Sequence, residues 1–443
     1  MADRITFALL VLILLVAFLF GGGGIGAALA NLAVQLTALG VLAARRDGWA
    51  AFWSESPLAL RTLIVASLAL PLLQLVPLPE SLWNTLPSRK LVSDSLQQAG
   101  GTGWMPLSVD PLRTLLALTA LVTPLAVLLA GWTLPRERLI DLGWMIVGLG
   151  LLTVLIGAVQ LTSGSAETTL YGDGYGRRVL VGTFANRNST GLFLTFAIGL
   201  AVLLPAPKPH PATLPVRLAI AAVLLLAVAL TQSRTAMVLA LLPTLMGAAR
   251  GVSAILQARK VTSSIARAAT VALGAIALVA AVAGALVVAA PGRIGEALER
   301  FEAKDDPRRF IWDDATFTAG RYWPVGAGVG TFHEIYQVDE SLENLTKRRA
   351  GRVHNDYIEV TIESGAAGLA LVTLWIMLLG WLSWRARLSS YRWAAWAASA
   401  FMLSIALQSI TDYPLRNQTM LAMAGFALLL LTRLASDRMR TKL

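Results

Sequence analysis

The sequence predicts an all-α polytopic membrane protein, with about twelve transmembrane helices and a large extracytoplasmic loop between the ninth and the tenth. The chain is 56% hydrophobic and only 14% charged, whereas about a quarter of the residues of a soluble domain are charged. Apolar runs long enough to cross a bilayer recur from end to end, and residues 291–353 form the only long polar segment. Residues 1–443 are therefore expected to form a single transmembrane domain.

The candidate spans are apolar runs of roughly 20 residues, the length of a helix that crosses the hydrocarbon core. The first run, residues 5–20, could be a signal peptide, because Ala28-Leu29-Ala30 resembles a cleavage site. However, a short glycine turn follows it and a second apolar run continues to Ala44, which favours a retained first span. The other spans are predicted at 57–76, 114–132, 139–162, 188–205, 214–231, 235–250, 266–290, 356–384, 391–410 and 414–434.

The distribution of lysine and arginine predicts the orientation, because cytoplasmic loops carry an excess of both. Lysine and arginine are more frequent in the even-numbered connections, the N-terminus and the C-terminal tail. Both termini are therefore predicted to be cytoplasmic. The loop 291–353 then faces the opposite side, as does the interfacial connection 77–113. In that connection Trp83 and Trp104 are expected at the membrane–water boundary.

The composition also excludes several kinds of site. The net charge of +11 is attributed to cytoplasmic loops, so no nucleic-acid partner is expected. The chain has no cysteine and three scattered histidines without a zinc motif, so neither a metal nor a cofactor is expected. The acid pairs 305–306 and 313–314 are interpreted as solvated caps, because hard cations need more oxygen ligands. The glycines of 326–330 are interpreted as turns of a packed loop rather than a nucleotide fingerprint.

Arginines stand in three polar motifs on the predicted outer side. Arg187 follows Asn186 at the start of the sixth span, where a helix N-terminus favours an anion. Arg234 joins two spans of only about 16 residues each, so its turn is expected below the membrane surface, where arginine needs an anionic partner. Arg309 and Trp312 lie in the large loop. Because guanidinium groups match phosphate geometry, converging arginines predict a lipid-borne diphosphate ligand.

A polar cluster lies where the large loop re-enters the membrane, and His354 stands at its mouth. Asn355 or Asp356 is expected to cap the helix that follows, and Glu359 has a spacing like that of a capping box. Asn355, Glu359 and Glu363 recur every four residues and so share one helix face. Glu363 lies about two turns inside the predicted span, and an ionisable group at that depth indicates function. Whether Glu359 and Glu363 act or merely cap stays open.

Together the motifs resemble the O-antigen ligase family, which also includes O-antigen polymerases and some protein O-oligosaccharyltransferases. The resemblance covers the motifs of residues 180–380 and the architecture of the whole chain. It implies a glycosyltransferase of the bacterial inner membrane that works on the periplasmic face. The matching motifs are Gly182-Thr-Phe-Ala-Asn-Arg-Asn188, Ser233-Arg234, Arg309-Phe-Ile-Trp312, and His354-Asn-Asp-Tyr-Ile-Glu359 with Gly365-Ala-Ala-Gly-Leu369.

The resemblance also implies a donor and roles for individual residues. The donor is a glycan on undecaprenyl pyrophosphate, with Arg187 and Arg234 holding the diphosphate and His354 as the candidate base. The reaction is expected to need no metal and to invert the anomeric carbon, because in-line attack requires no covalent enzyme intermediate. Supporting roles are expected for Asn186, Arg309, Trp312, Asn355, Tyr357, Glu359 and Glu363.

The acceptor stays open between a lipid A-core and another lipid-linked glycan. Ligation to lipid A-core is favoured because the motif set resembles the family under that name. The basic cluster Lys347-Arg348-Arg349, with Arg352, suits a phosphorylated acceptor, anionic headgroups or a second diphosphate. A polymerase that uses the same donor is the first alternative, and a transporter of lipid-linked oligosaccharides is the second.

Overall fold

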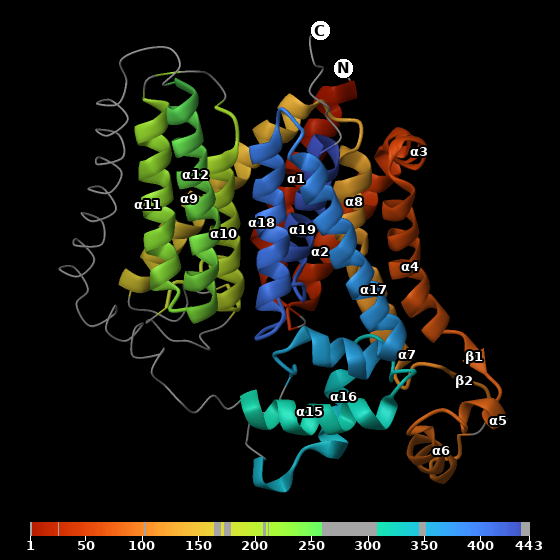
Figure 1. The fold of residues 1–443 in the computed structure, drawn as a ribbon. Helices are drawn as coiled ribbons and strands as arrows, with labels where there is room; N and C mark the ends of the chain where they lie inside the picture. The colour runs from red at the N-terminus through yellow and green to blue at the C-terminus, as the bar shows by residue number, and fades with distance from the viewer. Residues whose placement is uncertain are drawn as a thin grey trace.

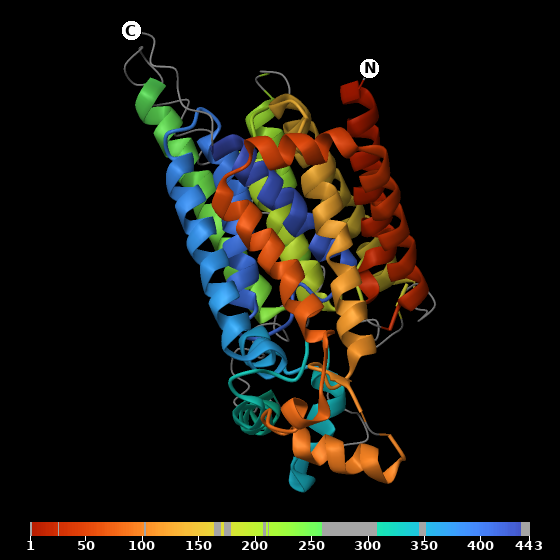
Figure 2. The ribbon, with the colours of Figure 1, turned by 90° about the vertical axis from the view of Figure 1, so that its right-hand side faces the viewer.

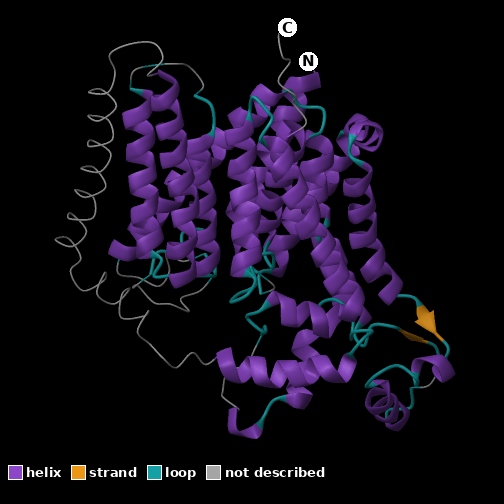
Figure 3. Ribbon diagram, viewed as in Figure 1, coloured by secondary structure: helices purple, strands orange, loops and turns teal. Residues whose placement is uncertain are grey.

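The computed structural model describes residues 2–24, 26–101, 103–163, 170–171, 179–206, 210, 212–258, 308–344 and 351–435. These residues form a bundle of long helices with a small helical module at one end (Figure 1). Strand is confined, within those ranges, to the antiparallel pair β1 (Pro77–Leu78) and β2 (Met105–Pro106) (Figure 3). The predicted span 266–290, the acid pair 305–306 and the basic cluster 347–349 lie outside the described residues.

Every other predicted span coincides with a helix of the bundle. The span 114–132 is divided in two at Leu121, because Pro124 lacks the N–H that would bond to the carbonyl of Ala120. The helices are α1 (Ala2–Phe20), α2 (Ala28–Ala44), α4 (Leu58–Gln74), α7 (Pro111–Ala120), α8 (Val122–Gly131), α9 (Arg136–Thr162), α10 (Arg187–Leu203), α11 (Thr213–Leu230), α12 (Arg234–Ala258), α17 (Asp356–Ala386), α18 (Arg392–Gln408) and α19 (Gln418–Ala435).

Seven helical segments of the described chain are long and apolar enough to cross a membrane. The number rises to eight if α2 and α3 (Arg46–Glu55), which meet at 76°, count as one bent span. The polytopic helical class is therefore confirmed, whereas the count of twelve stays a prediction. The expected shortness of the spans around Arg234 is wrong, because α11 has 18 residues and α12 has 25. The lengths of α11 and α12 therefore give no reason to expect Arg234 below the membrane surface.

Helix α19 forms the centre of the bundle. Every one of its residues except Arg433 is buried, and it packs against α1, α8 and α18. Its neighbour α10 is buried almost throughout, and Phe196 of α10 stacks on Phe401 of α18 at a centroid distance of 4.0 Å. The two helices therefore form the core, and α12 and α17 lie nearer its edge, with 22% of their apolar windows buried.

The loop module consists of the described residues of 77–110 and 308–344 and lies at the end of the bundle opposite both termini (Figures 1 and 2). It contains β1, β2, α5 (Glu80–Trp83), α6 (Arg89–Gln98), α15 (Arg308–Tyr322), α16 (Phe332–Asp339) and the short helix Leu342–Asn344. Buried Arg89 joins its two parts by donating to the carbonyls of Leu107 (2.6 Å) and Gly326 (2.9 Å).

The placement of Trp83 at the membrane–water boundary is wrong. Its side chain is 1% exposed and its indole N–H donates to the carbonyl of Pro106 at 2.7 Å, so it belongs to the interior of the loop module. Trp104 is 69% exposed. The two tryptophans differ because Trp83 has a polar partner inside the module, which an indole needs when it is buried.

Helix α17 is bent at Gly365, so the predicted span 356–384 is not one straight helix. Gly365 has φ +54°, and a Cβ at this position would lie 2.0 Å from the carbonyl oxygen of Pro324. That carbonyl accepts the backbone N–H of Ala366 at 2.9 Å. The segment around Gly326, Gly328 and Gly330, all with positive φ, is thereby packed against the bend. Residues 356–364 form a separate short helix at the edge of the loop module (Figure 1).

Candidate functional site

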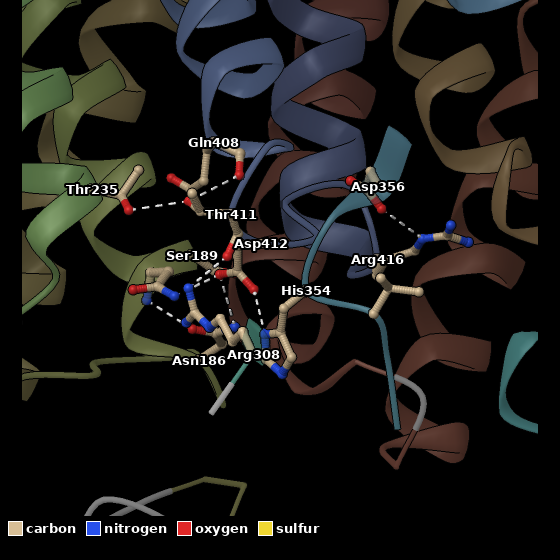
Figure 4. A network of polar contacts seen from close by, with 12 residues as sticks. Asn186, Ser189, Thr235, Arg308, His354, Asp356, Gln408, Thr411, Asp412 and Arg416 are labelled. Carbon is tan, nitrogen blue, oxygen red and sulfur yellow. Dashed lines mark hydrogen bonds and ion pairs between the residues drawn. The ribbon is translucent and has the colours of Figure 1, made fainter. Parts of the chain in front are cut away.

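The candidate site lies at the end of the bundle next to the loop module. The connection 409–417, between α18 and α19, meets the starts of α10 and α12 there, together with the segment that leads into α17 (Figure 4). Asp412 lies at the centre of these contacts and is 1% exposed. Its Oδ2 accepts hydrogen bonds from the side-chain amides of Asn188 (2.6 Å) and Asn186 (3.3 Å).

Asp412 is held in its ionised form. Burial alone opposes ionisation, but hydrogen bonds from His354 and Asn188 and the charge of Arg308 outweigh it and lower the pKa of Asp412 below its usual value. Asn186 caps α10 by accepting the backbone N–H of Asn188 at 2.8 Å. The N-cap is therefore Asn186, the residue directly before Arg187.

His354 faces Asp412 across 3.3 Å, from Nδ1 to Oδ1 (Figure 4). Because an ionised carboxylate can only accept, Nδ1 donates to it, and in the neutral ring the lone pair is then on Nε2, on the other side of the ring. The ring packs on Tyr413 at a centroid distance of 4.9 Å, and the side chain is 30% exposed. The backbone of His354 has φ +57°, an uncommon conformation for a non-glycine residue. The structure thus presents a partly exposed imidazole with its Nδ1 toward a carboxylate.

Arg187 and Arg234 are the first residues of α10 and α12, and both side chains are partly buried. The two helix starts are joined by a hydrogen bond from Ser233 Oγ to Asn188 Oδ1 (2.7 Å). Thr235 in turn lies 3.3 Å, oxygen to oxygen, from Thr411 (Figure 4). Arg187 is therefore next in sequence to Asn188, which bonds to Asp412. Arg234 lies between Ser233, which bonds to Asn188, and Thr235, which contacts Thr411. Two helix N-termini, which favour anions, are brought to the same place as His354.

The large loop brings Arg308 into contact with the connection 409–417, and the role of Arg309 stays a prediction. Arg308 donates to the carbonyl of Thr411 at 2.6 Å, whereas Arg309 lies on the exposed side of α15. Trp312 lies beside the histidine segment, and its indole N–H donates to the carbonyl of Val353 (3.0 Å). This bond fixes the backbone at Val353, one residue before the candidate base His354.

The other predicted supporting residues hold the start of α17. Asn355, and not Asp356, caps the helix by accepting the backbone N–H groups of Tyr357 (3.0 Å) and Ile358 (3.2 Å). The Tyr357 hydroxyl donates to the carbonyl of Ala406 at 2.8 Å, which ties α17 to α18. These contacts hold the histidine segment against α18 and the connection that follows it.

Glu359 and Glu363 are buried in an ion-pair cluster with Arg416. The Arg416 guanidinium lies 3.0 Å from Glu359 Oε1, 3.5 Å from Glu363 Oε2 and 3.4 Å from Asp356 Oδ1. Burial disfavours its charge, but these carboxylates outweigh that effect and raise the pKa of Arg416 above its usual range. Arg352 also bonds to Glu359, so it does not extend a basic surface as the sequence suggested. The two glutamates therefore face arginines rather than an open site.

Sequence reasoning gave no role to Asp412, Arg416 or Arg308, and it named Asn188 and Ser233 only as parts of motifs. The signal for the first two was an acid and an arginine in the short outer connection after α18. The predicted span 414–434 placed Arg416 inside an apolar segment, where an ionisable residue indicates a site or a buried partner. In the structure α19 begins only at Gln418.

No group of three or more histidine, aspartate or glutamate side chains lies close enough to hold a metal ion within the described ranges. Asp313 is exposed, and Asp314 is buried, where it accepts the backbone N–H of Ser341 at 3.1 Å. The absence of a metal or cofactor stays a prediction.

Residues 219–373 match the model of a protein family described as O-antigen ligase, which confirms the resemblance over that stretch. The stretch includes Arg234, Arg308 and His354, and Arg187 and Asp412 lie outside it. No curated protein matches the sequence. A chain of a peptidoglycan synthase complex, described as coordinating polymerization and crosslinking, aligns with 85% of this chain and 97% of its own length. Its identity is 17% and its TM-score 0.41, too weak a likeness to support an inference.

Proposed function

From the O-antigen ligase match of residues 219–373, we propose that this multi-pass membrane protein is a glycosyltransferase of the bacterial inner membrane. It transfers a glycan from undecaprenyl pyrophosphate to an acceptor on the periplasmic face. The observation that carries the proposal is the 3.3 Å pair of His354 and Asp412, placed where the arginine-bearing starts of α10 and α12 meet.

The chemistry needs one base and a stabilised leaving group. His354 Nε2 removes the proton from the acceptor hydroxyl, and the oxygen attacks the anomeric carbon of the donor. The bond to the diphosphate breaks as the new glycosidic bond forms, so the configuration inverts. Ionised Asp412 stabilises the resulting imidazolium, as the carboxylate of a catalytic triad does. Arg187 and Arg234 stabilise the charge on the departing diphosphate, the role that a metal ion would otherwise fill.

Ligation to lipid A-core is the activity that we propose first. A deletion strain should accumulate long polymer on undecaprenyl pyrophosphate and carry bare lipid A-core, and the unchanged gene should restore the ligated product. Arg187→Ala and Arg234→Ala should fail to restore it at normal protein levels, and lysine should restore it poorly, because it lacks the bidentate fork. Single repeat units on the carrier or core would show a polymerase. Normal product with Arg234→Ala would remove this residue from the diphosphate site.

The proposed orientation places both termini in the cytoplasm and the loop module in the periplasm. Its support is the basic bias of the connections, together with the location of the termini and the loop module at opposite ends of the bundle (Figure 2). Reporter fusions after residues 90 and 345 should therefore report periplasm, and fusions after 255 and at the C-terminus should report cytoplasm. A cytoplasmic signal from the fusion after 345 would place the site on the wrong side for a translocated glycan donor.

A further inference from the structure

A cavity of about 380 Å³, lined by both polar and apolar side chains, lies at the end of the bundle opposite the candidate site. It is enclosed by the C-terminal ends of α8, α17 and α19 and by the junction of α3 with α4, at the end where both termini lie (Figure 1). The charged residues that line it are Glu55, Arg385 and Arg433. Its volume falls in the range of ligand sites, which begins at about 300 Å³.

The cavity presents positive charge beside aromatic rings. Arg385 stacks over Trp381 at 4.7 Å, and Arg433 lies over Trp132 at 5.6 Å. Glu55 partly balances them: its Oε2 lies 3.6 Å from Arg433 Nη1 and accepts the indole N–H of Trp132 at 3.3 Å. Among the described residues that line the cavity, two guanidinium groups and one carboxylate give a net positive charge, which attracts an anion.

Tryptophans place the cavity at the depth of lipid headgroups. Helix α3, which meets α2 at 76°, lies across the end of the bundle (Figure 2). Trp49 and Trp53 are four residues apart on α3, and each is 41% exposed; Trp384 of α17 is 64% exposed. Exposed tryptophans gather at membrane–water interfaces, where the indole is half in the apolar layer and half in the polar one. Leu58, next to the cavity-lining Pro57, is 71% exposed and offers an apolar surface beside it.

We propose that this cavity binds the headgroup of an anionic phospholipid from the leaflet on the side of the termini. The phosphate lies between Arg385 and Arg433, and an acyl chain covers the apolar surface at Leu58. The occupant is a lipid rather than a soluble anion, because the cavity combines two guanidinium groups with an adjoining apolar wall. The proposal concerns the opposite end of the bundle and is independent of the proposed transferase.

The test is native mass spectrometry of the purified full chain, titrated with phosphatidylglycerol and with phosphatidylcholine of the same acyl chains. Phosphatidylglycerol should bind about tenfold more tightly, the effect of one charge-assisted contact. Arg385→Gln should remove that preference. Arg387→Gln is the matched control, because Arg387 is two residues away, stacks on Trp384 at 3.5 Å and does not line the cavity. It should bind phosphatidylglycerol as the unchanged chain does.

Glu55→Gln tests the same site with the opposite sign. Glutamine still accepts the Trp132 indole N–H but removes the negative charge, so phosphatidylglycerol should bind more tightly than to the unchanged chain. Equal affinities for the two lipids, equal effects of Arg385→Gln and Arg387→Gln, or weaker binding by Glu55→Gln would each overturn the proposal. Displacement of phosphatidylglycerol by an equal concentration of inorganic phosphate would show a soluble-anion site instead, and would also overturn it.

Discussion

Replacing His354 by alanine should lower the rate of glycan transfer by roughly 10²- to 10⁴-fold, the usual effect of losing a general base. The reason is that Nδ1 is engaged by Asp412 at 3.3 Å, which leaves Nε2 to accept the proton of the acceptor. Binding of the donor should be nearly unchanged, because the diphosphate contacts are assigned to Arg187 and Arg234. The rate is measured in single-turnover transfer by purified protein in proteoliposomes, and donor affinity is measured separately.

His333 provides a matched control for this experiment. It lies in α16, within the loop module, and none of the described residues forms a hydrogen bond with its Nδ1. His333→Ala should transfer at the normal rate. If the affinity for the donor falls together with turnover in His354→Ala, His354 binds the anion or positions the substrate, and its role as base is wrong.

Asp412→Asn tests whether the carboxylate acts through the histidine. Asparagine fills the same space but removes the charge that holds the proton on Nδ1, so the rate should fall by a similar factor of roughly 10²- to 10⁴-fold. The double variant His354→Ala, Asp412→Asn should be no slower than the slower single variant, because residues that act as a unit are not additive. Additive losses would mean that Asp412 acts through Asn186 and Asn188 instead.

Arg416→Met should be the most destabilising substitution of the site region. It removes the guanidinium that faces partly buried Asp356 and the two buried carboxylates of Glu359 and Glu363, of which Glu359 also pairs with Arg352. Breaking a buried ion pair by removing one partner costs about 3–5 kcal/mol of folding free energy. We expect little folded protein in the membrane, measured by fluorescence-detected size exclusion and thermal unfolding in detergent.

Neutralising a partner should reverse part of this loss. Arg416→Met with Glu363→Gln should be more stable than Arg416→Met alone, since one unpaired buried charge is removed without a change of volume. Arg113→Met is a control of comparable chemistry, because Arg113 of α7 pairs with Glu334 of the loop module at 2.7 Å and the two side chains are 37% and 30% exposed. It should cost no more than about 1 kcal/mol, as exposed pairs do. Equal losses of folding free energy from Arg416→Met and Arg113→Met would show that burial of the ion pair does not determine the loss.

The positions of the helices could be predicted from the sequence because the relevant signals are local. Runs of apolar residues lead to helices whether or not their partners are known, and each predicted span in the described ranges coincides with a helix. The helix start at Arg187, the cap by Asn355 and the turns at Gly326, Gly328 and Gly330 follow for the same reason. The family resemblance rested on motifs that contain Arg187, Arg234 and His354. The family match over residues 219–373 includes Arg234 and His354.

What the sequence by itself determined is therefore the helical membrane class, most helix boundaries and the residue types at the mouth of the site. Only the tertiary structure decided which charges meet. Asp412 is 58 residues from His354 and 224 from Asn188, and no periodic pattern spans such distances. The same holds for Arg416 and Glu359, and for the bend at Gly365 where Pro324 packs. Ion pairs and hydrogen bonds between distant segments depend on how helices pack, whereas the preference of each segment for a helix depends on its own residues.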